Sequence, residues 1–556
     1  MVSATNILGQ STDSGQVNAT PAMPLVPAVP AGLTITGTNS LVSLSWNAST
    51  PATGYNIKRA LTNGGPYTVI GTTAGTAYTD TLVVSNTTYY YVVSATNISG
   101  ESANSAQVST MVLFPVWQYS ASFFILTTPS GANLAASASE TNFPVLVRLT
   151  TNFFNFSQAR ANGGDIRFAT TNGAFLPHEI EEWNSAGGTA AIWVRIPLIK
   201  GNASQEIKMY WGSTDATNGS TGPAVFNASN GFASVFHLSD ATTDATGSTA
   251  PVNAGTTGTT GVVGSGRHFV SGQGIACGTG LTNLPYGNNP NSSETWFRAS
   301  ASGTSLLGWG LPTGQAMVGV QIAIPPTINI NCWGGGGGVS GATTIALSQW
   351  HHLAHTYQNG QARLYLNGVL DGTSSGGGMN IPAPSAMSIG GFGNYSFAGD
   401  LDEARISSVA RSADWVKMEY ENQKPLQTLV GNLVPPGSAF TVAPTSVVMQ
   451  EGATTNFTGQ AGGAQKVYWV IKQNGQETIV AVDQLSYTLA AGRVAGDQSL
   501  VLQFKAVNRT GVQTNDIPVT IKEVLPDPVY TLTAPATWDG RQTVNITPNI
   551  SNWSAL

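Results

Sequence analysis

Two segments of this chain repeat one another at an offset of 91 residues. Residues 2–19 and 93–110 are identical at 11 of 18 aligned positions. A period of this length corresponds to one β-sandwich domain, because solenoid repeats are only about 20–50 residues long. The repeated segment is the end of its domain, so the chain is expected to begin inside the tail of an earlier copy. Residues 1–28 are predicted to be this truncated tail with its linker, and residues 29–112 a complete copy.

A low charge content extends the β prediction to the whole chain. Only 9% of the 556 residues are charged, against roughly 25% in an ordinary soluble domain, while 41% are hydrophobic. The surface must then be covered by Thr, Ser, Asn and Gly, which suit strands and turns better than long helices. Because 556 residues exceed one hydrophobic core, we expect several all-β domains of about 100–200 residues each.

The same composition argues against several partners. The net charge is −6, and the 22 Lys and Arg residues form no cationic stripe, so binding to nucleic acid or to an anionic membrane is not expected. No apolar run reaches the length of a transmembrane helix, and the N-terminus has no signal-peptide pattern. No membrane insertion is therefore predicted within this fragment.

Residues 29–112 carry short runs of alternating polarity separated by turns, which is typical of an antiparallel sandwich. Trp46 stands on the second predicted strand and Tyr55 on the third, and Tyr89 and Tyr91 precede the repeated segment. On these residues the segment resembles a fibronectin type III domain. The resemblance implies that the aromatic rings fill the core and that a tyrosine hydroxyl bonds backbone at a corner.

Residues 113–230 form the next predicted unit. Its strand-like runs cover residues 143–149, 176–184, 192–197 and 207–212. This succession resembles the bacterial domain of unknown function 2341, which commonly stands directly before a LamG domain. The resemblance implies architecture and little chemistry.

Residues 231–425 contain the run Val235-Phe236-His237-Leu238 and the run Trp350-His351-His352, followed about fifteen residues later by Asn367-Gly368. Asn-Gly is the turn that a tight hairpin favours. With Gly399-Asp400-Leu401-Asp402-Glu403 further on, the segment resembles a LamG, or concanavalin A-like, jelly-roll. This resemblance implies carbohydrate binding and one structural Ca²⁺. A short helix is expected to close the domain.

The predicted fold class is therefore all-β, with sandwiches flanking a central β domain and a jelly-roll. Residues 436–523 read as an immunoglobulin-like sandwich without cysteines, and residues 524–556 as the start of a further truncated sandwich. The two cysteines, Cys277 and Cys332, lie in strand-like runs and can be free buried thiols or one bridge inside the jelly-roll.

Paired carboxylates are the first candidates for catalysis, because glycoside hydrolysis needs two of them about 5–10 Å apart. Strand alternation places Glu179 and Glu181 on one face, where two like charges can raise one pKa. Alternation also places Asp400 and Asp402 on one face and Glu403 on the other. A solvated sheet face explains the first group equally well, and a structural or calcium-related role is favoured over catalysis for the second.

Calcium is the cofactor that the LamG resemblance implies. Asp244, in an Asp-x-x-Gly loop, and Asp402 or Glu403 are the candidate ligands, since Ca²⁺ prefers hard oxygen donors. The alternative is that Asp244 is a turn residue that bonds its own backbone.

Sugar binding uses flat aromatic rings together with uncharged hydrogen-bonding side chains. Trp309, Trp333, Phe392 and Tyr395 all lie near glycine-rich turns and form the predicted platform. Taken singly, each of them is more often a core residue, so one or two of the four are expected in the binding groove.

Three functions remain open from the sequence. The first is a secreted or cell-surface module that binds polysaccharide or a cell-surface glycan. The second is a glycoside hydrolase acting on β-glucan or a similar polymer through one of the carboxylate pairs, and the third is a purely structural stalk. The combination of fibronectin-like and LamG-like modules implies export or surface display, whereas the glycan and the oligomeric state stay undetermined.

Overall fold

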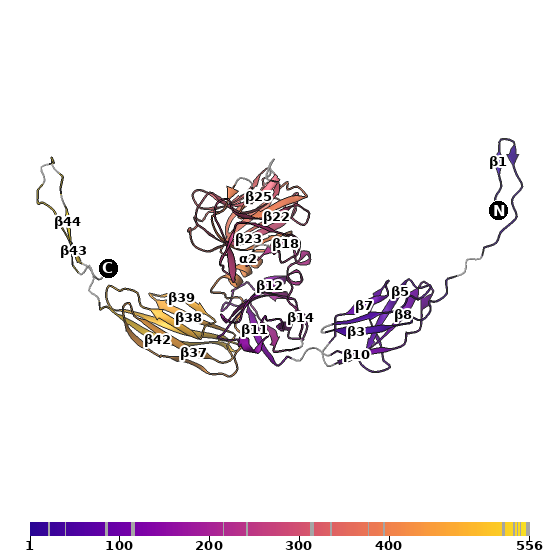
Figure 1. Ribbon diagram of the computed structural model, residues 1–556, viewed down its shortest axis with the longest axis horizontal. Coiled ribbons are helices and arrows are strands. Elements are labelled where there is room, and N and C mark those ends of the chain that lie inside the picture. Colours follow the sequence, from indigo (N-terminus) through magenta and orange to yellow (C-terminus); the bar gives the residue numbers. More distant parts are fainter. Residues whose placement is uncertain are drawn as a thin grey trace. The chain divides into compact units, whose positions relative to one another are not determined.

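The computed structural model divides the chain into two compact units, Met1–Val116 and Trp117–Leu556 (Figure 1). It describes all residues except 20–22, 39–40, 84–86, 113–116, 215, 241–242, 312–315, 334–335, 376, 393–394, 525–528, 538–539, 542, 545 and 552–556. Within the described residues, strands β1–β44 contrast with only two α-helices, which confirms the all-β prediction.

The first unit contains a short hairpin and a two-sheet sandwich. The hairpin is β1 (Thr5–Asn6) and β2 (Gly9–Gln10). One sheet of the sandwich has the order β3 (Thr34–Thr38), β4 (Leu41–Ser45), β7 (Ala77–Asp80). The other has the order β10 (Val108–Val112), β8 (Thr87–Asn97), β5 (Gly54–Ala60), β6 (Thr68–Thr73), with β9 (Gly100–Glu101) beside β8. This is a fibronectin type III sandwich.

The predicted aromatic residues fill the core of this sandwich. Trp46 and Tyr55 meet edge to face with ring centroids 5.4 Å apart, and Tyr91 is completely buried. The Tyr55 hydroxyl accepts a hydrogen bond from the backbone N–H of Ser49 at 2.8 Å. The Tyr91 hydroxyl donates to Asp80 at 2.9 Å. Both rings therefore join apolar packing to a satisfied polar end, as buried tyrosines require.

The second unit begins with a domain of two small sheets, called here the central domain. Its four-stranded sheet has the order β11 (Tyr119–Leu126), β17 (Ser204–Trp211), β13 (Arg167–Thr170), β14 (Phe175–Leu176). Its three-stranded sheet has the order β12 (Ser139–Thr150), β16 (Thr189–Lys200), β15 (His178–Asn184). Three short helical turns complete it, η1 (Phe156–Gln158), α1 (Gly222–Val225) and η2 (Ala228–Asn230).

A jelly-roll of two large antiparallel sheets follows (Figure 1). The eight-stranded sheet has the order β20 (Thr257–Thr260), β21 (Ser265–Phe269), β34 (Gly399–Ser407), β23 (Asn291–Ala299), β28 (His351–Gln358), β29 (Gln361–Leu366), β30 (Val369–Ser375), with β18 (Phe232–Phe236) beside β34. The seven-stranded sheet has the order β19 (Val252–Ala254), β22 (Gly274–Leu281), β31 (Ser385–Ile389), β24 (Thr304–Leu311), β25 (Ala316–Ile322), β26 (Ile328–Trp333), β27 (Val339–Ser340). A small hairpin, β32 (Gly391–Phe392) and β33 (Tyr395–Ser396), contacts β24.

Helix α2 (Ala413–Gln423) joins the jelly-roll to the central domain. The side chain of Ser412 caps its N-terminus by accepting from Trp415 N–H at 2.9 Å. Trp415 packs on Phe143 of the central domain with centroids 4.7 Å apart, while Val416 packs on the eight-stranded sheet. At the other end, the Asn422 amide exchanges two hydrogen bonds with the backbone of Leu146. The two domains therefore share one core through this helix.

The unit ends with the immunoglobulin-like sandwich. One sheet has the order β35 (Phe440–Ala443), β37 (Thr454–Ala461), β40 (Ser486–Ala490). The other has the order β36 (Val447–Gln450), β42 (Gly511–Lys522), β41 (Gln498–Asn508), β38 (Lys466–Gln473), β39 (Gln476–Val482), and only β36 and β42 run parallel. Trp469 is completely buried in its core. A last hairpin is formed by β43 (Val529–Thr533) and β44 (Thr547–Ser551).

Both cysteines are free, Cys277 on β22 and Cys332 on β26. Three strands separate β22 from β26, which places them roughly 19 Å apart at about 4.8 Å per strand. A disulfide needs Cα atoms within about 7 Å, so sheet order rules out the bridge that the sequence left open.

Within the described part of the chain, no helix combines the length and the apolar character needed to cross a membrane.

We expect Trp415→Ala to loosen the central domain and the jelly-roll together. The substitution removes an indole ring that is only 3% exposed from the core that the two domains share. This lowers the free energy of unfolding by about 3–5 kcal/mol. Hydrogen exchange of the full chain should accelerate in both β12 and β28, and Val369→Ala, at an exposed position, should leave both unchanged. Acceleration in only one of the two strands would contradict a shared core.

Two buried histidines on β28 predict acid sensitivity of the jelly-roll. Burial lowers the pKa of His355 to about 3, and burial with the nearby Arg405 charge lowers the pKa of His352 to about 3. The unfolded chain therefore binds more protons than the folded chain below about pH 6.5, and stability falls as the pH is lowered through this window. Each histidine accounts for about 2 kcal/mol between pH 6.5 and pH 5.

Calorimetry of His355→Leu at pH 7 and pH 5 checks this expectation. The variant should lose less thermal stability on acidification than the wild type, because one group that takes up a proton on unfolding is gone. Gln358→Leu, at the exposed end of the same strand, is the control and should keep the full loss. An unchanged loss in His355→Leu would be evidence against the buried neutral imidazole.

Candidate functional site

The predicted carboxylates of two domains meet where the central domain contacts the jelly-roll. Glu179 and Glu181 come from β15, and Asp402 and Glu403 come from β34. His237 follows directly after β18 and lies between these two strands. We call Glu179, Glu181, His237 and Glu403 the seam cluster.

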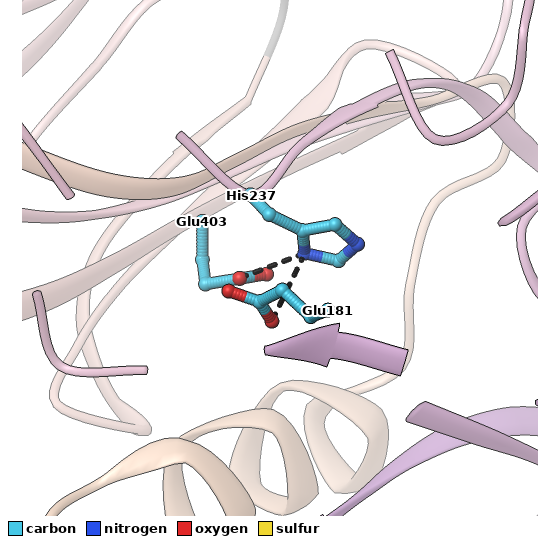
Figure 2. Close-up of side chains that lie close together, drawn as sticks. All are labelled: Glu181, His237 and Glu403. Carbon is cyan, nitrogen blue, oxygen red and sulfur yellow. Dashed lines mark hydrogen bonds and ion pairs between the residues drawn. The ribbon is translucent and has the colours of Figure 1, made fainter. Parts of the chain in front are cut away.

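Figure 2 shows the carboxylates of Glu181 and Glu403 directed at the same edge of the His237 imidazole. Nδ1 of His237 lies 2.8 Å from Glu403 Oε1 and 3.5 Å from Glu181 Oε2. The opposite ring nitrogen, Nε2, lies 3.3 Å from Glu179 Oε2. The imidazole also stacks on Trp193 with ring centroids 5.6 Å apart. Its orientation is thus fixed by contacts on the ring face and at both nitrogens.

Arg405 supplies the main positive charge beside the seam cluster. Its guanidinium lies 2.6 Å from Glu403, 2.9 Å from Glu419 and 3.3 Å from Glu294. The same group lies over the Trp193 ring, 4.4 Å from its centroid. Because Arg405 is only 1% exposed, each of these ion pairs forms with little competition from water.

Burial and neighbouring charges shift the pKa values of four residues here, Glu181, Asp402, Glu403 and His237. Burial and the nearby Glu403 charge raise the pKa of Glu181 well above its ordinary value. Burial and Glu403 raise the pKa of Asp402 as well. Burial also opposes ionisation of Glu403, but the positive charges of His237 and Arg405 outweigh it and hold the pKa of Glu403 below its ordinary value. Burial disfavours the charged form of His237, yet the surrounding carboxylates raise its pKa well above the usual range.

Two β-bulges explain why Glu181 and Glu403 both point toward His237. The register of β15 shifts between Ile180 and Glu182, which makes Glu181 the extra residue. The register of β34 against β23 shifts in the same manner, and Glu403 there adopts a left-handed backbone with φ 52°. Strict alternation predicted Glu403 on the face opposite to Asp402, and that prediction is wrong because the bulge turns both to the outer face.

The structure thus brings some of the predicted catalytic acids together and places others elsewhere. Glu179 and Glu181 lie on one face, as predicted, and both reach His237. Asp400 belongs to a separate group, 2.7 Å from His268 and 2.8 Å from Arg298. The side chains of Glu181 and Glu403 are 1% and 0% exposed, and Asp402 is 0% exposed. A polymer chain cannot reach carboxylates that are buried in this way.

Two of the three predicted calcium ligands, Asp244 and Asp402, are engaged by donors of the protein itself. Asp244 uses both oxygens to accept from Val235, Thr246 and Thr249, so it is a turn residue that braces its loop. Asp402 accepts from the N–H groups of Val262, Val263 and Glu403. These oxygens are engaged by N–H and O–H donors and are not left for a cation. Among the described residues, the one set of three potential ligand side chains within 4.8 Å is Glu181, His237 and Glu403.

The predicted aromatic platform is corrected in two of its four members. Trp309 is 0% exposed and donates its indole N–H to the Pro285 carbonyl, and Phe392 is 5% exposed. Both rings are packed between other parts of the jelly-roll and cannot stack on a sugar. Tyr395 on β33 is 46% exposed, so its ring remains a candidate. The side chain of Trp333 lies outside the described residues.

The two sheets of the jelly-roll differ sharply in charge. None of the residues in the seven strands of the seven-stranded sheet is Asp, Glu, Lys, Arg or His. The eight-stranded sheet carries Arg405, the seam acids Asp402 and Glu403, and the buried histidines. Charge is thus concentrated in the sheet that α2 covers and is absent from the other.

Alternation along β25 and β26 separates a core face from an outer face. Val318, Val320, Ile322, Ile328 and Ile330 belong to the core. The residues between them therefore point outward. They are Gly319, Gln321, Asn329 and Asn331, and Ser340 and Ser388 extend the row on neighbouring strands. We call this row the amide face.

The amides on this face bond to one another. Asn331 donates to Gln321 Oε1, and Asn329 donates to Asn331 Oδ1 at 3.2 Å. Ser340 donates to Asn329 Oδ1 at 3.2 Å. The amide nitrogen of Gln321 is buried and has no hydrogen-bond partner within the part of the chain that the structure describes, whereas Asn329 and Asn331 are half-buried.

Sequence reasoning missed two residues of the seam cluster and its surroundings, His237 and Arg405. His237 is separated from Glu179 by 58 residues and from Glu403 by 166 residues, so no local spacing connects them. The available signal was weaker: a single histidine directly after the apolar strand β18, and a lone arginine within an otherwise acidic and apolar strand.

Comparison with known proteins agrees with this architecture. Residues 269–417 match the concanavalin A-like lectin/glucanases superfamily, and residues 162–243 match the domain of unknown function 2341. The chain is a multidomain all-β protein with a concanavalin A-like domain. The resemblances to the domain of unknown function 2341 and to a concanavalin A-like domain are confirmed.

Curated relatives match over short segments. Exoglucanase B from Cellulomonas fimi is 32% identical over 29% of this chain and 14% of its own length. Amylopullulanase from Thermoanaerobacterium saccharolyticum is 37% identical over 16% of this chain and 7% of its own length. Poly(3-hydroxybutyrate) depolymerase from Ralstonia pickettii is 44% identical over 15% of this chain and 16% of its own length. The chain thus spans less than a fifth of the length of these relatives.

Two solved structures are also similar. Domain 4 of an extracellular arabinanase from Geobacillus stearothermophilus, in complex with arabinotriose, is 19% identical over 34% of this chain and 97% of that chain, with a TM-score of 0.29. A Fn3-like protein from Clostridium thermocellum is 41% identical over 17% of this chain and all of that chain, with a TM-score of 0.15.

Removing the positive charge of Arg405 should destabilise the second unit. Arg405→Met leaves Glu294, Glu403 and Glu419 buried without their partner, which costs about 3–5 kcal/mol, or roughly 6–20 °C in thermal midpoint. Arg363→Met, at an exposed position of the same sheet, is the matched control and should shift the midpoint little. Calorimetry of the full chain that gave equal midpoints for the two variants would refute this role of Arg405.

Proposed function

We propose that this chain is a carbohydrate-binding segment of a larger exported protein and that the amide face holds a neutral polysaccharide. Neutral sugars present many hydroxyl groups and no charge, so they are bound by amides, hydroxyls and aromatic rings. The observation that carries the proposal is the complete absence of charged side chains from the seven-stranded sheet, beside its row of outward amides.

The accessible side chains of this face are neutral hydrogen-bonding groups: Ser340 is exposed, and Asn329 and Asn331 are half-buried. The exposed ring of Tyr395, on a hairpin that contacts β24, supplies an aromatic surface next to the sheet.

The comparisons support a carbohydrate ligand in general terms. Three curated relatives are named as an exoglucanase, an amylopullulanase and an alpha-amylase, and one solved neighbour contains arabinotriose. Because the matched segments are small parts of these proteins, we infer a shared accessory role and not a shared reaction. The arabinanase is named as extracellular, which supports secretion or display at the cell surface.

Binding is favoured over hydrolysis because of where the acids lie. A glycosidase needs two carboxyl groups that reach the scissile bond from opposite sides. In this chain the converging acids are the buried ones of the seam cluster, and the amide face has none. We therefore propose retention of polysaccharide without cleavage.

Retention of the full chain on insoluble neutral glucans and arabinans, compared with a charged polysaccharide, tests the proposal. Asn329→Ala with Asn331→Ala should weaken retention on the neutral polymer about five- to tenfold, since about 1 kcal/mol is lost with one net hydrogen bond. Gln361→Ala, an amide removed from the eight-stranded sheet, is the control and should bind like the wild type.

Two outcomes would overturn this function. One is equal retention of the double variant and the wild type on every neutral polymer that the wild type binds. The other is release of reducing ends from the polymer by the purified chain, which would show hydrolysis in place of simple binding.

A further inference from the structure

The seam cluster has the composition of a metal site. One imidazole nitrogen and two carboxylates, from His237, Glu181 and Glu403, offer ligand atoms that all lie within 4.8 Å of one another. Ligands at about 2.1 Å from a tetrahedral ion are about 3.4 Å apart. The separation of His237 Nδ1 from Glu181 Oε2 is 3.5 Å, and its separation from Glu403 Oε1 is 2.8 Å. An increase of about half an ångström in one contact would make room for an ion.

Each of these three side chains is held in place by a second group. Glu179 lies 3.3 Å from Nε2 of His237, in position to accept its proton and so leave a lone pair on Nδ1. Arg405 holds one oxygen of Glu403 at 2.6 Å and leaves the other facing His237. The indole N–H of Trp193 donates to Glu181 Oε2 at 2.7 Å. Such outer contacts orient the ligands in known metal sites.

The second oxygen of Glu181 points independently to a missing ligand. Its side chain is 1% exposed, and Oε1 has no hydrogen-bond partner within the described residues. A buried carboxylate oxygen without a partner is strongly unfavourable. An ion bound between Glu181, His237 and Glu403 would satisfy it.

We propose that Glu181, His237 and Glu403 bind one divalent transition-metal ion, with Glu179 orienting His237, and that this ion links the central domain to the jelly-roll. An imidazole ligand favours Zn²⁺ or Mn²⁺ over Ca²⁺, which prefers oxygen alone. The site is distinct from the amide face and stands or falls without it.

The full chain, stripped with a chelator and then exposed to Zn²⁺, Mn²⁺ or Ca²⁺ in separate samples, provides the test. Metal is counted by mass spectrometry after gel filtration. We expect one equivalent of Zn²⁺ or Mn²⁺ per chain and a higher thermal midpoint for the loaded chain. Binding of Ca²⁺ alone, or no bound metal in any sample, would overturn the proposal and leave an ion pair with a protonated His237.

Matched variants locate the ion. Glu181→Gln should weaken Zn²⁺ binding at least tenfold, and Glu179→Gln should weaken it about 10–100-fold through the orientation of His237. Glu182→Gln makes the same change in charge on the next residue, which lies outside the set of ligands, and should bind like the wild type. Equal binding by Glu181→Gln and Glu182→Gln would refute the assignment.

A cobalt experiment keeps the question decidable if Glu181→Gln fails to fold. Co²⁺ added to the stripped wild-type chain should give visible absorption bands of a low-coordinate site and should be displaced by one equivalent of Zn²⁺. A spectrum identical to that of aqueous Co²⁺ would exclude the site in the wild type itself.

Discussion

Burial of a charged network between two β domains is the constraint on which the second unit depends. Arg405 sits on Trp193 and pairs with three acids, and every member of this group is removed from water. A buried charge is tolerated only when its partners are in place, and the partners here come from β15, β23, β34 and α2. The central domain and the jelly-roll are therefore specified together, and neither can move away from the other without exposing or orphaning charges.

The two sheets of the jelly-roll therefore have different roles. The eight-stranded sheet carries the charges and histidines. Helix α2 packs on this sheet through Val416, and Asn422 of the same helix bonds to the central domain. The seven-stranded sheet carries no charge and turns its amides outward. An uncharged face is ill suited to hold another protein domain by ion pairs but well suited to a polymer of hydroxyl groups. The proposed ligand and the proposed metal thus occupy opposite layers of one fold.

Sequence alone could predict the domain types, since these follow from local patterns. Alternating polarity, the buried Trp46 and the Asn367-Gly368 turn all act over a few residues. The candidate site was harder to predict from the sequence, because a β-bulge leaves no mark in the amino-acid composition of its strand. Glu403 was assigned to the wrong face for that reason. Trp309 was included among the platform candidates because of its glycine-rich neighbourhood, which is equally common in a core strand. His237 finds its partners only through the packing of two domains.

The central claim is that neutral polysaccharide binds the amide face. Hydrogen exchange of the full chain, with and without a soluble oligosaccharide of the retained polymer, measures this directly. We expect the sugar to slow exchange in β25 and β26 and to leave β28, β29 and β30 unchanged. Protection confined to the eight-stranded sheet, or to the other sandwiches, would contradict the account.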